Sequence, residues 1–174
     1  MKRTFSLEHI FAALSILPLV IFLRVAGWYG FTYAAWMRAF LAGAALASAV
    51  LFFFFLKKNP VRDILLASSL FLVSGGIAFL AGAKPVLDFY LKWQGSVFIA
   101  WYLAVRAGLL FAPGLFTGLV RDPYAKRAEL AFILSALALA WSVFHRNLLL
   151  STVLPVALLL FVLSLAGRSE VTQP

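Results

Sequence analysis

The sequence predicts an all-α membrane protein, a polytopic bundle of about six transmembrane helices with both termini in the cytoplasm. Hydrophobic residues make up 64% of the 174 residues, charged residues only 12%, and the mean hydropathy is +1.02. Soluble domains carry about 25% charged residues. The apolar residues form repeated runs close to the roughly 20 residues that a spanning helix needs. These runs are continuously apolar, whereas the strands of a membrane barrel alternate in polarity.

Six apolar runs divide a single integral membrane domain, residues 1–174. We expect helices over residues 9–24, 31–56, 64–83, 95–120, 128–144 and 148–166. Short charged segments, several containing proline, separate the runs and are expected to end the helices. The first run follows Lys2 and Arg3 as in a signal peptide, but no good cleavage site follows, so we expect a retained helix. Because only residues 145–147 separate the last two runs, five spans and six both stay open.

The basic residues predict the orientation in a bacterial inner membrane, since cytoplasmic loops are enriched in lysine and arginine. With six helices and the N-terminus inside, nine basic residues fall inside: Lys2, Arg3, Lys57, Lys58, Arg62, Arg121, Lys126, Arg127 and Arg168. Four fall outside: Arg24, Lys84, Lys92 and Arg146. The net charge of +9 is therefore interpreted as a topology signal. Since the charges are scattered over loops, nucleic-acid binding is not expected.

Composition argues against an enzyme, a metal site or a bound cofactor. The chain has no cysteine, which excludes thiolate chemistry. His9 and His145 fall at opposite ends of the predicted topology and show no metal-binding spacing. Membrane enzymes need clustered catalytic groups. The six acidic residues form no convergent pair by spacing: Glu8, Asp63, Asp88, Asp122, Glu129 and Glu170.

Two arginines within the apolar runs are candidate contacts for a lipid phosphate or another anion. Arg106 lies near the middle of the fourth run, where a charged side chain costs roughly 2.5–3.5 kcal/mol and usually faces a cavity or a partner. Its guanidinium fork suits a phosphate or a carboxylate. A structural role stays open, in which the side chain snorkels or bonds to backbone carbonyls. Arg38 is close enough to the start of its run to reach the interface by snorkelling.

An aromatic and charged motif, Asp88, Phe89, Lys92 and Trp93, precedes the fourth run. If that helix begins early, the acid and the base lie one turn apart on one face, as an amphipathic entry into the membrane. In the predicted topology Trp141 and the other tryptophans fall at the outer ends of the helices. Such residues either anchor the interface or form an outer surface for lipid or protein.

Pairs of small residues four apart are expected to let helices pack closely in lipid. Gly43 with Ala47 and Gly114 with Gly118 have this spacing. The pattern specifies no partner and leaves a homo-oligomer open. Proline residues 18, 113 and 155 are expected to kink or break their helices.

Five segments together match the pattern of a known family: Leu17–Phe22, Gly75–Gly76, the motif from Asp88 to Trp93, Ala107–Leu110 and Leu137–Phe144. Through these segments the chain resembles the septation protein A family of small bacterial inner-membrane proteins. It departs from the family pattern at Ala138, where asparagine is usual, and at Gln94, where a second basic residue is usual. The resemblance implies a role in envelope maintenance or septum formation, through division and wall-synthesis proteins, and no catalytic activity.

The sequence therefore favours a non-enzymatic envelope protein that acts through membrane proteins and lipids. The alternative is a small transporter or lipid-handling protein that binds an anionic substrate through Arg106.

Overall fold

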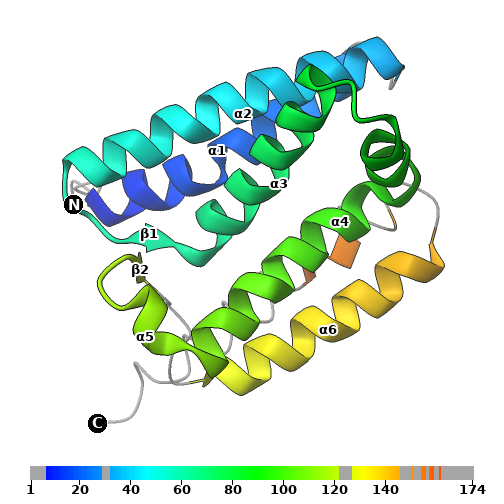
Figure 1. Ribbon diagram of the computed structural model, residues 1–174. Coiled ribbons are helices and arrows are strands. Elements are labelled where there is room, and N and C mark those ends of the chain that lie inside the picture. The colour runs from blue at the N-terminus through cyan, green and yellow to red at the C-terminus, as the bar shows by residue number, and fades with distance from the viewer. Residues whose placement is uncertain are drawn as a thin grey trace, which may run out of the picture. The chain divides into compact units, whose positions relative to one another are not determined.

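The computed structural model describes residues 7–28, 32–121, 127–145, 150, 154, 155, 157, 158 and 161. These residues are almost entirely helical, which confirms the all-α prediction. They fall into two compact units. The first contains α1, α2 and α3 with the short strands β1 and β2, and the second contains most of α4 with α5 and α6 (Figure 1).

In the first unit α1 (Leu7–Trp28), α2 (Tyr33–Leu56) and α3 (Asp63–Leu80) pack against one another in all three pairings. An aromatic cluster fills the space between them. Phe40 of α2 lies 4.8 Å from Phe22 of α1 and 5.2 Å from Phe71 of α3, measured between ring centroids. Trp36 and Phe79 extend the cluster, with ring centroids 6.1 and 5.5 Å from that of Phe40. Rings at these separations add to the stabilisation that burial alone provides.

Glycines let these rings approach the helix backbones. A Cβ atom added to Gly75 of α3 would lie 2.3 Å from the Phe40 ring. One added to Gly43 of α2 would lie 2.9 Å from Leu72 and 3.3 Å from Phe22. Gly43 and Ala47 are both buried, as expected for a pair that permits close packing.

α2 and α3 both end in the same pattern of backbone hydrogen bonds at the C-terminus of the helix. After α2, the Lys58 amide bonds to the Phe55 carbonyl and the Asn59 amide to the Phe54 carbonyl. After α3, the amides of Gly82 and Ala83 repeat this pattern, bonding to Phe79 and Ala78. The motif needs a left-handed residue, here Lys58 (φ 51°) and Gly82 (φ 61°). It ends α3 at Leu80, so the prediction that this helix reaches residue 83 was wrong.

Two short strands that are far apart in the sequence pair with each other. β1 (Val61–Arg62) and β2 (Val120–Arg121) pair in parallel, Val61 opposite Val120. Residues 118–120 are thus outside any helix, whereas the sequence predicted a helix over 95–120.

α4 runs from Lys84 to Phe111, and its residues from Asp88 onward belong to the second unit. The same unit contains α5, from Pro113 to Phe116, and α6, from Ala128 to Phe144. The prediction for 128–144 is confirmed. The fourth helix was placed wrongly at both ends, because it begins at Lys84 and breaks before Pro113. Proline lacks an amide hydrogen and disfavours helical geometry in the residue before it. Ala112 accordingly leaves the helix, with φ −138° and ψ 53°.

The remaining boundaries differ by a few residues or lie outside the described part. The helices predicted at 9–24 and 31–56 are found at 7–28 and 33–56. Thr32 starts the latter, because its hydroxyl accepts a hydrogen bond from the Ala35 amide at 3.2 Å. Most of the helix predicted at 148–166 lies outside the described residues.

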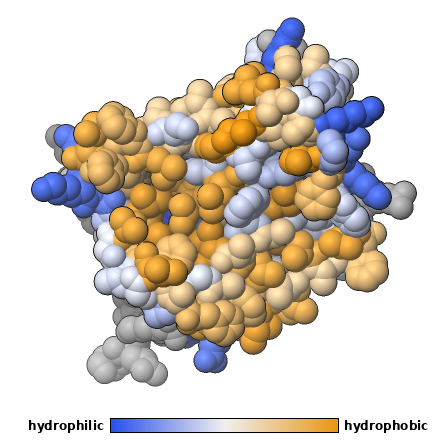
Figure 2. Space-filling view, viewed as in Figure 1, coloured by the Kyte–Doolittle hydropathy of each residue, from blue (hydrophilic) through white to orange (hydrophobic). Residues whose placement is uncertain are grey.

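The described chain contains two helices long and apolar enough to cross a membrane, α2 and α3. α4 consists of two parts, Lys84–Trp93 and Gly95–Phe111, that meet at 95°. If the bent pair is one span, there are three. Apolar side chains predominate on the face shown in Figure 2, and many large apolar side chains of the described residues are exposed.

We expect Gly75→Ala to destabilise the protein by about 1–3 kcal/mol, because the new methyl group would overlap a buried ring. Phe40 cannot move aside easily, since rings from two other helices pack on it. Gly114→Ala is the control, because no atom in the described part of the chain lies within 4 Å of a Cβ at that position. Thermal unfolding of both variants in detergent measures the difference, and equal midpoints would contradict the packing argument.

Candidate functional site

Among the described charged residues of the second unit, Arg106 is the most deeply buried, with 1% of its surface exposed. Its Nε and one terminal nitrogen both donate to the Tyr102 hydroxyl, each at 3.2 Å. The guanidinium carbon lies 5.4 Å from the centre of the Tyr102 ring. Tyr102 is one helical turn before Arg106, so the i, i+4 spacing could have identified it from the sequence.

This arrangement favours a structural role for Arg106. A buried guanidinium must have its donors satisfied within the protein. The shared hydroxyl and the aromatic ring of Tyr102 both stabilise the charge. With 1% exposure, the side chain presents almost no surface to a ligand in this conformation. Arg38, the other candidate, is an exposed residue of α2 in the first unit.

Serines hold α4 and α6 together. Ser96 of α4 and Ser142 of α6 are buried, and their hydroxyls lie 2.7 Å apart. Nearer the other end of α6, Phe132 packs edge to face with Phe111 of α4, with ring centroids 5.8 Å apart. The two helices therefore run antiparallel. The Ser96–Ser142 pair was not predicted, because two serines 46 positions apart carry no pairing signal in the sequence.

The Asp88–Trp93 motif lies in the first part of α4, before the bend. Since α4 begins at Lys84, Asp88 and Lys92 do lie one turn apart on one face, and both are exposed. Phe89 is 52% exposed, and the Lys92 ammonium lies 5.6 Å from the centre of the Trp93 ring. An aromatic and charged helix surface of this kind suits a membrane interface.

A hydrogen bond spans the bend. The Trp101 indole nitrogen donates to the Tyr90 hydroxyl at 3.2 Å. In a straight helix, 11 residues would separate the two along the axis by about 16 Å. The 95° bend between Trp93 and Gly95 brings them together.

The Gly114–Gly118 pair does not pack helices as predicted. Gly114 belongs to the four-residue α5, and Gly118 lies beyond it with φ 75°. No atom of the described residues lies within 4 Å of a Cβ at either position. Instead Gly108 of α4 provides the close approach, because its Cβ would lie 2.6 Å from the Phe116 ring of α5.

Trp141, predicted as part of the interface, lies at the end of α6 and is 46% exposed. Its ring stacks on His145, with ring centroids 4.1 Å apart and an angle of 17° between the planes. Its indole nitrogen donates to the Leu150 carbonyl at 3.1 Å. Trp141 is therefore a partly exposed aromatic residue that is held by a ring contact and a hydrogen bond.

In the described part of the chain, no three His, Cys, Asp or Glu side chains gather as metal ligands. Comparisons with protein-family models, with curated proteins and with solved structures found no match.

We expect Tyr102→Phe to destabilise the protein by about 1 kcal/mol, since it removes one hydrogen-bond acceptor for a buried cation and keeps the ring. Tyr33→Phe removes a hydroxyl from an exposed tyrosine and serves as the control. Thermal unfolding in detergent compares the two. If both variants match the wild type, the Tyr102 hydroxyl does not stabilise Arg106.

Proposed function

We propose that this chain is a six-helix protein of a bacterial inner membrane, with both termini in the cytoplasm, that catalyses no reaction. It supports envelope maintenance or septation through contacts with other membrane proteins and with lipids. One observation carries this proposal. The helices long enough to span a membrane expose large apolar side chains, among them Phe52 and Phe55 of α2 and Ile77 and Leu80 of α3. Such surfaces suit lipid or a membrane partner.

The polar side chains within the helices support a role without chemistry. The hydroxyls of Ser68 and Ser69 donate to the Leu65 carbonyl, and that of Ser135 to the Ala131 carbonyl. Each of these hydroxyls therefore donates its hydrogen bond to a backbone carbonyl of its own helix. The septation role is supported by the resemblance of the Asp88–Trp93 and Leu137–Phe144 segments to septation protein A.

The alternative, an anion carrier that uses Arg106, has less support. An anion would have to reach a side chain that is 1% exposed and already donates to Tyr102. We therefore prefer the contact role.

Native-level expression of the tagged protein, gentle solubilisation and mass spectrometry of bound molecules test the partner proposal. We expect division or wall-synthesis proteins to co-purify. Phe89→Gln should reduce their recovery, because it removes an exposed ring from the interface motif, while Leu115→Gln, at an exposed position of α5, should not. Recovery of one anionic lipid alone, without such proteins, would contradict the proposed protein contacts and favour the carrier.

The absence of native cysteine permits a direct test of topology. In intact cells we expect a membrane-impermeant thiol reagent to label Lys84→Cys, on the outer side, and not Ser169→Cys. Opening the cells should make Ser169→Cys reactive. Labelling of Ser169→Cys in intact cells would place the C-terminus outside and rule out six spans with an internal N-terminus.

A further inference from the structure

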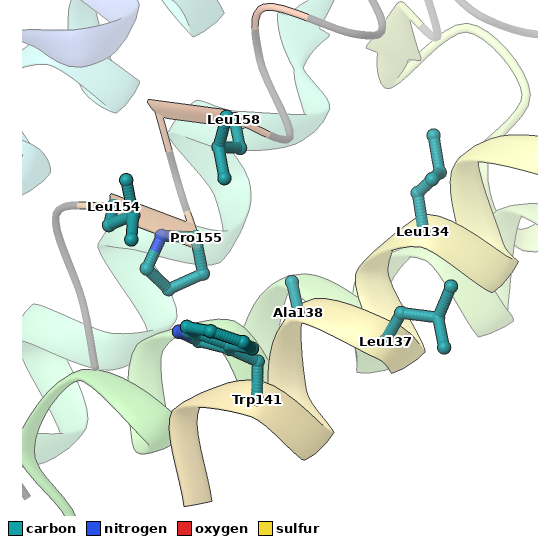
Figure 3. A pocket seen from close by; sticks show the side chains of 7 residues that line it. All are labelled: Leu134, Leu137, Ala138, Trp141, Leu154, Pro155 and Leu158. Atoms are coloured by element: carbon teal, nitrogen blue, oxygen red, sulfur yellow. The ribbon is translucent and has the colours of Figure 1, made fainter. Parts of the chain in front are cut away.

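An apolar pocket of about 280 Å³ lies beside α6 in the second unit (Figure 3). Four α6 residues form one side: Leu134, Leu137, Ala138 and Trp141. The other side is formed by three residues that follow this helix in the chain: Leu154, Pro155 and Leu158. The pocket is open to the surroundings, since Leu137 and Leu158 are 61% and 52% exposed.

The residues that line the pocket favour a hydrocarbon ligand. Among its seven residues only Trp141 has a side-chain heteroatom, and this nitrogen already donates to the Leu150 carbonyl at 3.1 Å. Pockets for polar ligands contain a few placed polar groups that fix orientation. This lining offers no free side-chain donor or acceptor, and burying an unpaired polar ligand group there would be costly. A ligand for this pocket is therefore apolar where it contacts the walls.

The α6 wall of the pocket is elongated along the helix, which favours a ligand shaped like an acyl chain. The α6 residues follow i, i+3, i+4 and i+7 spacing, which aligns them in one stripe about 10 Å long. Trp141 closes one end of the stripe, where its ring stacks on His145. The other end is Leu134, two turns back toward the middle of an apolar helix. A long, narrow apolar molecule fits such a stripe better than a compact one.

We propose that this pocket binds one acyl chain of a membrane phospholipid. The inference rests on the proposed membrane location, because only there does an open apolar pocket face acyl chains. Trp141 and His145 mark the interfacial end of the pocket, as aromatic residues do at membrane surfaces. The acyl chain lies along α6 toward Leu134, with its headgroup near His145. Pocket binding differs from ordinary lipid contact because it saturates at one chain.

The test uses the full-length protein, purified in detergent and freed of lipid. It is titrated with palmitoyl-oleoyl phosphatidylglycerol, and native mass spectrometry counts the bound lipids. We expect one saturable site. Ala138→Phe should weaken it about tenfold or more, since the ring fills space that the chain would occupy. Ala140→Phe adds the same ring at an exposed position of α6 outside the lining and should bind like the wild type.

A second variant keeps the test informative if Ala138→Phe does not fold. Leu137→Gln changes an exposed wall residue at similar volume and should also weaken binding. Glycerophosphoglycerol, a headgroup without chains, should not compete. The inference is overturned if Ala138→Phe and Leu137→Gln bind like the wild type, or if the headgroup alone displaces the lipid.

Cell fractionation separates this inference from the proposed function. If the wild type is absent from the membrane fraction, both fail. If it is in the membrane and recovers its protein partners, but binds no lipid saturably, the pocket inference alone fails.

Discussion

Every polar group in an apolar chain needs a hydrogen-bond partner inside the protein, because hydrocarbon offers none. The local motifs follow from this constraint. Thr32 satisfies an amide at the start of α2, and amides of the following turn satisfy carbonyls at its end. Serines within α3 donate to carbonyls one turn back in the same helix. Among the described buried side chains, every nitrogen and oxygen has a hydrogen-bond partner.

Because most of these polar groups form hydrogen bonds within their own helix, the packing between helices depends on how well their side chains fit together. In lipid, apolar helix faces gain little from meeting each other rather than the acyl chains, so close van der Waals contact must provide the association. Phe40 illustrates this, since its ring lies where a Cβ of Gly75 would be. Rings from α1 and α3 then surround it. α4 and α5 use the same device, with Phe116 over Gly108. A phenylalanine ring packed against a glycine therefore occurs in both units.

The sequence could predict what depends on composition and on local backbone chemistry. The all-α class, the limits of Ala128–Phe144 and the break at Pro113 were of this kind. The start of α4 was missed because the boundary was set by where apolar residues begin, whereas an amphipathic segment such as 84–93 can be helical without being apolar. Gly118 was misassigned because it lies beyond the end of α5, with φ 75° and no place in a helix. The pocket depends on residues 154–158, whose position no local pattern gives.

Arg106 shows how burial changes the interpretation of a charge in an apolar run. The sequence alone left a ligand contact and a structural role both open, because a charge in an apolar run usually faces a cavity or a partner. Its surroundings favour the structural role. Arginine can donate from two nitrogens to one hydroxyl and still lie against the ring that carries it, whereas lysine has a single nitrogen. Arg106 and Tyr102 thus form a compact polar centre within α4. If that centre is structural, specificity must come from surfaces that other molecules can reach. The exposed part of the Asp88–Trp93 motif and the α6 pocket are both such surfaces, and both are bounded by a tryptophan near the end of a helical segment.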